Sequence, residues 1–416
     1  MANRHKAGVK NRQFNPAASK LTVLKQICNF IPPHLVPKLA RETGAADKAR
    51  DFSNWSHVVS LLQAQLSHAI GLNDVCDGLQ LNAGALVTIR GATPPSRNGL
   101  SHANKVRPAE MAEKLFWGVL DSLGQTSPGF IKGKSRGRAH RFKVPIHIVD
   151  TTVIELVANA MDWAKHRRRK AAAKTHLRLN LQSLLPQCVI IDTAKEHDNV
   201  RARELCAEIK EGEIVIFDKG YIDFDHLLDL DKRGVNWVTR AKDNMNYEVI
   251  QSLPLEGHRK ILADEIISLK DTRKSAPEIM RRVRALVEVD GQEREMVFLT
   301  NQLLWSPNTV AELYRCRWEI EVFFKQIKQT LQIADFLGHN ANAVRWQVWI
   351  ALLTYVLLRY LSYLSKWNHS FTRMFTLIRA ALWRKIHLLE LLRSYGTAGG
   401  HFRHLATPAQ AYFAGF

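Results

Sequence analysis

Two short apolar segments of the sequence each end in an aspartate: residues 144–149 precede Asp150, and residues 214–217 precede Asp218. Apolar runs of this length favour buried strands, and carboxylates at the ends of neighbouring strands can converge at one edge of a sheet. Such a cluster can hold two Mg²⁺ ions about 4 Å apart, which activate the attacking oxygen and stabilise the leaving oxygen in phosphoryl transfer. An aspartate after a strand is also a common turn residue, so each aspartate taken singly is more often structural.

A third carboxylate, Glu321, lies within residues 309–330, which the apolar spacing predicts to be one long helix. Four side chains with chemical potential follow one another there at steps of three, four and seven residues: Tyr314, Arg317, Glu321 and Lys328. At about 100° per residue these steps return to nearly the same helix face. Arg317 and Lys328 would therefore bracket the carboxylate and could grip DNA phosphates beside it. The alternative is an ordinary amphipathic helix with a salt-bridged polar face.

In this order and spacing the four residues match Tyr-x2-Arg-x3-Glu-x6-Lys, the signature of the insertion-sequence-four family of bacterial DDE transposases. The segment Asp150-Thr151-Thr152 resembles the first-aspartate motif of that family. Asp218-Lys219-Gly220-Tyr221 is similar to the second motif, with Lys219 in place of the usual arginine. Trp163-Ala164-Lys165 and Lys174-Thr175-His176 also stand where many members carry similar segments. The resemblance covers roughly residues 140–365.

The resemblance implies an α/β fold of the RNase H-like class: a mixed five-stranded sheet with flanking helices, a β-rich insertion and a helical N-terminal domain. It implies that Asp150, Asp218 and Glu321 are catalytic ligands of Mg²⁺, for which Mn²⁺ could substitute. Tyr314, Arg317 and Lys328 would contact phosphates at the transposon end. One departure concerns a tryptophan that receives a flipped base in studied relatives, because Met296 or Val297 stands at the matching place.

The implied activity is that of a DDE transposase, a two-metal-ion nuclease and strand transferase. It would bind the terminal inverted repeats of an insertion sequence and cut and join double-stranded DNA, acting on a target as a homodimer in a synaptic complex. The alternative from another class is a DNA-binding protein that does not cut, such as a repressor or a domesticated transposase. The intact carboxylate trio favours the enzyme, because a non-cutting protein does not need it.

Strand patterns predict the elements that would position these carboxylates. Apolar runs predict five strands, at residues 144–149, 175–181, 187–191, 214–217 and 235–239. A helical segment at residues 199–211 completes the element order of the RNase H-like fold. Asp290-Gly291, between two extended runs, predicts a hairpin in the polar, strand-like region that follows. Residues 346–358 are apolar but too short to cross a bilayer, which predicts a buried helix and no membrane partner.

These elements suggest a division of the chain into domains. Residues 1–125 are predicted to be a helical domain for DNA binding or dimerisation. Within it, short helices at residues 73–79 and 83–89, followed by a basic loop at residues 97–107, could form a helix-turn-helix reader; a small packing bundle is at least as compatible. A basic linker follows at residues 126–143. The catalytic core is predicted in two parts, residues 144–240 and 297–365, on either side of a β-rich insertion at residues 241–296. Residues 366–416 are predicted to form a helical C-terminal region.

The charge balance favours a polyanionic partner. Lys and Arg number 59 against 39 Asp and Glu, a formal net charge of +20, and each neutralised phosphate releases condensed counterions. A membrane surface or ribosomal RNA would fit the same charge. Further DNA contacts are predicted from basic side chains in the linker, in the loop before the second core strand and on that strand: Arg136, Arg138, Arg167, Arg168, Arg169 and Lys174.

The five cysteines show neither CxxC spacing nor a disulfide framework. With a basic N-terminus that lacks a following apolar run, this predicts a cytoplasmic protein. The resemblance implies that it is bacterial and associated with the nucleoid. No phosphate-cradling glycine motif or catalytic Ser/His pair is present, which disfavours an ATP-driven or serine-type recombinase.

Overall fold

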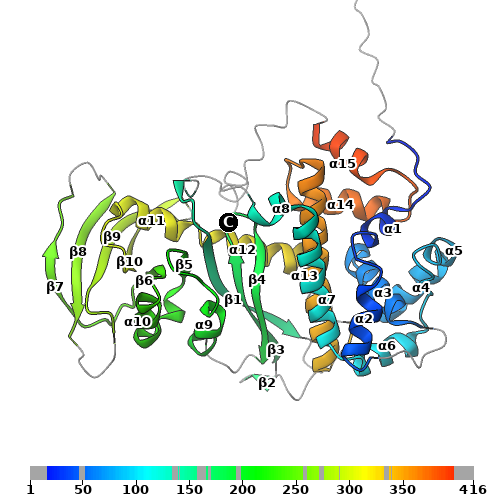
Figure 1. The fold of residues 1–416 in the computed structure, drawn as a ribbon, viewed down its shortest axis with the longest axis horizontal. Helices are drawn as coiled ribbons and strands as arrows, with labels where there is room; N and C mark the ends of the chain where they lie inside the picture. Colours follow the sequence, from blue (N-terminus) through cyan, green and yellow to red (C-terminus); the bar gives the residue numbers. More distant parts are fainter. Residues whose placement is uncertain are drawn as a thin grey trace, which may run out of the picture.

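The structure is a computed structural model that describes residues 16–45, 52–133, 139, 141–156, 165–166, 170–193, 198–255, 260–270, 276–289, 291–331, 337–338 and 340–397. The described residues form an elongated molecule (Figure 1). A large sheet with its helices fills one half, and a bundle of helices around one long helix fills the other.

The centre of the sheet contains the five predicted strands. They are β1 (Ile146–Leu156), β3 (Lys170–Asn180), β4 (Leu185–Thr193), β5 (Ile214–Phe217) and β6 (Asn236–Arg240). Their spatial order is β4-β3-β1-β5-β6, in which the first three are antiparallel and β1, β5 and β6 are parallel. The short β2 (Lys165–His166) pairs with β3. The predicted α/β fold with a mixed five-stranded core is therefore confirmed.

The β-rich segment extends this sheet rather than forming a separate one. The added strands are β7 (Tyr247–Ser252), β8 (Ile261–Leu269), β9 (Met280–Val289) and β10 (Gln292–Thr300), and β10 pairs antiparallel with β6. The predicted hairpin is present, because Gln292 faces Val289 across the turn and Gly291 has a φ of +74°, where glycine carries no steric penalty. The described strands together form a ten-stranded sheet.

Helices cover both faces of the sheet. Leu205 and Leu227, from α9 (Asp198–Cys206) and α10 (Phe224–Lys232), pack against one face together with Phe217. On the other face, α11 (Pro307–Arg315) packs against β8, β9 and β10, and α12 (Trp318–Lys325) lies over β1. Side chains alternate along a strand, so the odd and even residues of each central strand enter different cores.

The predicted single helix at residues 309–330 is interrupted. Between α11 and α12 the amides of Cys316, Arg317 and Glu319 bond to carbonyls three residues back, which tightens the turn. After α12 the chain forms one π-helical turn, η3 (Gln326–Thr330). These two irregularities change the angular relation of the four side chains that a uniform helix would place in one stripe.

The helical half is built around α13 (Ala341–Ser365). The surrounding elements are α1 (Val23–Cys28), α2 (Leu35–Glu42), α3 (Asn54–Ser67), α4 (Leu72–Leu81), α5 (Ala83–Leu86), α6 (Arg97–Val106), α7 (Glu110–Thr126), α8 (Pro128–Lys132), α14 (Phe371–Ala381) and α15 (Leu388–Thr397). N-terminal and C-terminal helices share one hydrophobic core that also contains α12 and part of β1 and β3. Side chains interlock them: Gln26 donates to the carbonyl of Ile386, and Trp346 donates to the carbonyl of Arg107.

The central helix α13 is longer than the predicted buried segment. With 25 residues it is long and apolar enough to span a membrane by length and composition alone. However, 78% of its most apolar window is buried inside the protein, as in the core helix of a globular fold.

Two predictions for the N-terminal region are wrong in detail. The second helix of the suggested helix-turn-helix is α5, with four residues, too short to lie along a major groove as a recognition helix. The segment predicted as a basic loop forms α6, and Arg107 at its end donates inward to the carbonyls of Phe52 and Ser53. The structure therefore supports the packing interpretation of this segment.

Candidate active site

Strand pairing brings Asp150 and Asp218 side by side. The parallel ladder between β1 and β5 ends at the pair Val149 and Phe217, so the two aspartates follow at the same level on strands about 5 Å apart. Because side chains alternate along a strand, both aspartates point to the same face of the sheet as Ile148, the face that α11 and α12 cover. The expected strand end at Asp150 is wrong, because β1 continues beside β3 to Leu156. Asp218 does end its strand and begins the turn η2 (Lys219–Tyr221).

The signature segment supplies the remaining groups. The Tyr314 hydroxyl donates to Asp218 Oδ1 at 2.8 Å. Arg317 Nη1 donates to Asp150 Oδ2 at 3.0 Å, and its Nη2 donates to Glu321 Oε1 at 2.7 Å. One guanidinium therefore bridges two carboxylates and a phenol holds the third, so Asp150, Asp218 and Glu321 converge on one place.

Burial sets the electrostatics of this cluster. It raises the pKa of Asp150 to about 6; the Arg317 guanidinium opposes the shift, whereas Glu321 and Asp218 add to it. Burial also raises the pKa of Tyr314 well above its ordinary value, so its hydroxyl remains a donor. For Arg317, burial acts to lower the pKa, but the effects of Tyr314 and the three carboxylates are together larger. The net pKa of Arg317 is therefore raised, and the guanidinium stays charged.

The carboxylates fit a divalent cation by chemistry, although their present arrangement is held by Arg317. Within the described residues, no group of three or more His, Cys, Asp and Glu side chains is close enough to hold a metal ion. The reason is visible in the hydrogen bonds, since the guanidinium lies between Asp150 and Glu321. Hard oxygen donors are the ligands that Mg²⁺ prefers. Three carboxylates paired with one guanidinium also leave an excess of negative charge, which favours a cation.

A hydroxyl network joins the motif segments around Asp150. The Thr151 amide donates to Asp150 Oδ1 at 2.8 Å. The Thr151 hydroxyl hydrogen-bonds to His176 Nδ1 at 2.8 Å and to the hydroxyl of Tyr221. Three stretches that lie far apart in the sequence therefore fix the strand on which Asp150 is carried. Lys219 turns outward instead and pairs with Asp243 at 3.1 Å.

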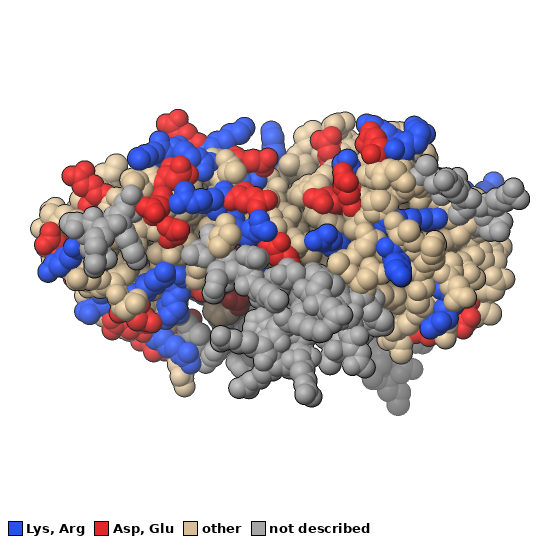
Figure 2. All heavy atoms as spheres, turned by 90° about the horizontal axis from the view of Figure 1, so that it is seen from below, with Lys and Arg blue, Asp and Glu red and all other residues tan. Residues whose placement is uncertain are grey.

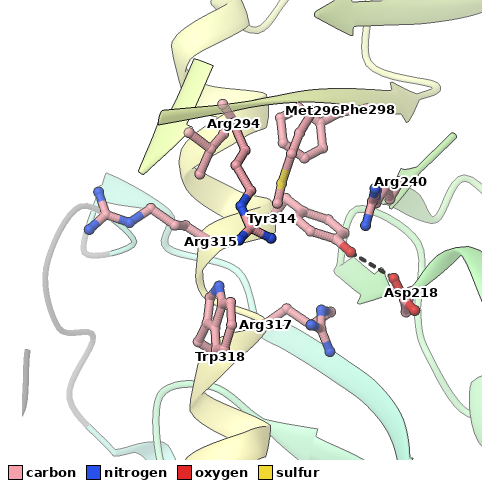
Figure 3. A pocket seen from close by; sticks show the side chains of 11 residues that line it. Asp218, Arg240, Arg294, Met296, Phe298, Tyr314, Arg315, Arg317 and Trp318 are labelled. Carbon is pink, nitrogen blue, oxygen red and sulfur yellow. Dashed lines mark hydrogen bonds between the residues drawn. The ribbon is translucent and has the colours of Figure 1, made fainter. Parts of the chain in front are cut away.

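A cavity of about 240 Å³ opens beside Asp218 (Figure 3). It is lined by Asp218, Arg240, Val287, Arg294, Met296, Phe298, Ala311, Tyr314, Arg315, Arg317 and Trp318. Met296 faces this cavity, whereas Val297 packs into the opposite core. Trp318, 44% exposed, stands at the rim.

Sequence reasoning missed Arg240 and Arg294, which line the cavity. Neither belongs to a motif. Alternation along β10 together with the register of the β6–β10 pair would have placed them, but that pairing is not visible in the sequence.

Two of the other predicted DNA contacts lie on described elements. Lys328 lies half-buried in the π turn, and Lys174 lies partly buried on β3, opposite Val153 of β1. The remaining predicted DNA contacts lie outside the described residues: Arg136, Arg138, Arg167, Arg168 and Arg169.

Comparisons with known proteins show what the chain is similar to. Residues 142–357 match the family model of the transposase DDE domain, and residues 19–89 match a domain of unknown function. The chain is 28% identical over 324 residues to a putative transposase, y4zB, of Sinorhizobium fredii, covering 77% of this chain and 86% of the relative. It is 25% identical over 193 residues to the transposase InsG for insertion sequence element IS4 of Escherichia coli, covering 44% and 42%.

Two further likenesses extend this set. The chain is 28% identical over 225 residues to a probable transposase for insertion sequence element IS5377 of Geobacillus stearothermophilus, covering 54% of this chain and 58% of that one. A solved piggyBac transposase synaptic complex with hairpin DNA superposes on 97% of the chain, and 88% of its own, with a TM-score of 0.46 and 8% identity.

Proposed function

The chain belongs to the DDE transposase domain family, and from this premise we propose that it cuts the ends of an insertion sequence and joins them to a target by DNA phosphoryl transfer. The observation that carries the proposal is the convergence of Asp150, Asp218 and Glu321 under Arg317 and Tyr314. Enzymes commonly use a cluster of carboxylates to hold divalent cations at a scissile phosphate.

The three carboxylates would hold Mg²⁺ or Mn²⁺, and the bound ions would supply charge stabilisation for the attacking and leaving oxygens. Without bound ions, the Arg317 guanidinium neutralises the charges of Asp150 and Glu321. Once released from one carboxylate, its planar fork can donate to a phosphate oxygen. Tyr314 keeps Asp218 oriented, and its raised pKa suits a group that donates a hydrogen bond rather than a proton.

The substrates we propose are the terminal inverted repeats and a target duplex, brought together by a homodimer in the bacterial cytoplasm. The net charge of +20 supports binding to DNA. On the face shown in Figure 2, basic and acidic side chains are interspersed rather than gathered in one basic stripe. We therefore expect affinity to come from local clusters of basic side chains.

A second candidate is a DNA-binding protein that does not cut. The observation in its favour is that Arg317 neutralises two of the carboxylates directly. The two functions differ in a measurable way, because only the enzyme converts DNA when Mg²⁺ is added.

The test uses the purified full chain and a labelled duplex that carries the end of its own element. We expect Mg²⁺-dependent cleavage by the wild type, and a loss of at least about a thousandfold in rate for Asp150→Asn, Asp218→Asn and Glu321→Gln. Binding of the same duplex without metal should stay within a few-fold, because it rests on many phosphate contacts. Wild-type protein that binds the end but never cuts it would establish the second candidate.

A further inference from the structure

Two arginines, Arg240 and Arg294, line the cavity beside Asp218 from neighbouring strands. Arg240 ends β6 and is the Cα partner of Phe298 on β10. Arg294 and Phe298 are four residues apart on β10 and therefore share a face of the sheet. Both arginines project toward the face on which α11 carries Tyr314, as Figure 3 shows.

Within the described part of the chain, these two guanidinium groups lack the counter-ion that other arginines of the same sheet have. Arg281 is paired with Asp264, and Arg282 with Glu265. Among the described residues, neither Arg240 nor Arg294 makes a hydrogen bond or an ion pair with a side chain. A charged side chain that the fold leaves without a partner is available for a charge from outside.

The walls of the cavity strengthen an attraction to such a charge. Phe298 is fully buried and Val287 and Met296 are half-buried, so the arginines act beside apolar surface, where the effective dielectric constant is lower than in water. Arg315 also lines the cavity, but its side chain turns away from Arg240 and Asp218 in Figure 3. The anion site is therefore formed by the two strand arginines.

Sheet order places this site in line with the carboxylates. The strands run β1, β5, β6, β10, and their register puts Asp150, Asp218 and Arg240 one after another across the sheet in steps of about 4.8 Å. Arg294 lies four residues along β10 from Phe298, the residue level with Arg240, and lines the same cavity. A DNA strand laid along this line with one phosphate at the carboxylates would place another phosphate near Arg240 and the cavity that Arg294 also lines.

We propose that Arg240 and Arg294 form a phosphate-binding subsite for DNA on the side of Asp218 away from Asp150. This proposal deepens the transposase function and rests on it for the identity of the anion. The phosphate could belong to the strand that is cut or to the target strand that is joined. The chemistry of recognition is the same in both cases, charge-assisted donation from planar guanidinium groups to phosphate oxygens.

The experiment compares Arg240→Gln/Arg294→Gln with Arg282→Gln/Arg284→Gln in the full chain. The control pair removes the same charge from the opposite face of neighbouring β9, where Arg284 pairs with Glu295. Duplex-end binding is measured without metal over a range of salt concentrations. We expect the slope of log K against log salt to fall by about 0.9 for each phosphate that the first variant no longer neutralises. The control pair should keep the wild-type slope.

Two kinetic arms identify the source of the phosphate. One measures cleavage of an uncut labelled end, and the other measures joining of a pre-cut end to a target duplex. A loss of about tenfold or more in the cleavage arm assigns the subsite to the cut strand, and a loss confined to the joining arm assigns it to the target strand. Arg240→Lys/Arg294→Lys should restore the salt slope but only part of the rate, since lysine lacks the fork.

The proposal is overturned if Arg240→Gln/Arg294→Gln retains the wild-type salt slope and both rates, or if the control pair loses as much. Thermal unfolding of all variants shows that they are folded. A wild type that binds the end through these arginines and never cuts would defeat the proposed function while leaving the subsite intact.

Discussion

Arg317 is the residue on which the geometry of the site depends. The sequence predicts it as a phosphate contact, and the structure shows it bridging Asp150 and Glu321 from the tightened turn between two helices. The sequence could not reveal this, because the bridge depends on the close approach of β1, which lies far earlier in the chain. In the absence of DNA, the same side chain therefore serves as the counter-ion of the carboxylates.

We expect Arg317→Lys to cut the labelled end about a hundredfold more slowly than the wild type while binding it within a few-fold. Lysine keeps the charge but loses the planar fork that reaches two carboxylates at once, and small misplacements at a reacting centre are costly. Arg315→Lys is the matched control, an exposed neighbour whose side chain turns away from Asp218 in Figure 3. Equal cleavage rates for Arg317→Lys and wild type would contradict this role.

Two buried histidines should make the protein sensitive to mild acid. Burial lowers the pKa of His57 to about 3 and that of His226 to about 4. His57 has Asn104 Oδ1 at 2.8 Å from its Nε2, and neither ring nitrogen of His226 has a hydrogen-bond partner among the described groups. Both rings are neutral when folded, whereas the unfolded chain takes up protons below about pH 6.5.

The unfolding free energy should therefore be insensitive to these groups above about pH 6.5 and fall below it, by up to about 1.4 kcal/mol per pH unit for each histidine. The fall should continue toward the folded pKa values. Denaturant unfolding of the wild type and of His57→Gln at pH 7 and pH 5 measures the effect. The variant should lose less stability between the two pH values, and an equal loss would show that His57 does not titrate in this way.

At the scale of elements, the sequence predicted the five core strands and the hairpin of β9 and β10, because apolar runs and Asp290-Gly291 are local signals. It did not predict that β10 would pair with β6, since partner choice between distant strands leaves no local trace. The break at residues 316 and 317 was also hidden, because neither Cys316 nor Arg317 interrupts a helix by its own propensity.

The insertion strands hold the start of the signature helix through a buried ion pair. Arg281 is 3% exposed and donates from Nε and Nη2 to Asp264 at 2.7 and 2.6 Å. Its remaining nitrogen donates to the carbonyls of Leu303, at 3.0 Å, and Trp305. This irregular segment leads directly into Ser306, the N-cap of α11, so the ion pair fixes where that helix begins.

Arg281→Lys should destabilise the protein by about 1–3 kcal/mol, because lysine keeps the charge but leaves Asp264 and the carbonyls incompletely paired. In folded Arg281→Lys protein, hydrogen exchange of the backbone amides in α11 should be faster than in the wild type. The rate of DNA cleavage should fall, whereas the affinity for the DNA end should be unchanged. Arg282→Lys is the control, since its pair with Glu265 on the same strands does not reach this segment. Equal amide exchange in the two variants would refute the positioning role.

At the scale of the whole molecule, the helical half cannot be treated as a detachable module. Leu115 and Phe116 of α7 are fully buried in the core that also contains Trp346 and Trp349 of α13. The domain boundary predicted at residue 125 stays a prediction. A helical region that is defined along the sequence can still share its hydrophobic core with a later part of the chain, as α7 does with α13. Periodicity shows that a helix has an apolar face but not which helix covers it.

Removal of residues 1–125 should therefore produce an insoluble or molten protein rather than an active core. The deletion exposes the face of α13 that α3 and α7 cover, a large apolar surface that favours aggregation. Solubility, circular dichroism and end cleavage of the truncated chain measure this. A soluble, cooperatively folded truncation that still cuts DNA would show that the two halves are independent.

The position of α13 in the chain also has a consequence for synthesis. The helices that surround it include some made before it and some made after it, and Gln26 finds its partner Ile386 across 360 residues. Until residue 365 has left the ribosome, the apolar faces of α3 and α7 that cover α13 lack that partner, and exposed faces of this kind recruit chaperones. The nascent chain therefore carries these faces uncovered until α13 has been made, and the core that α12 shares with α13 can be completed only then.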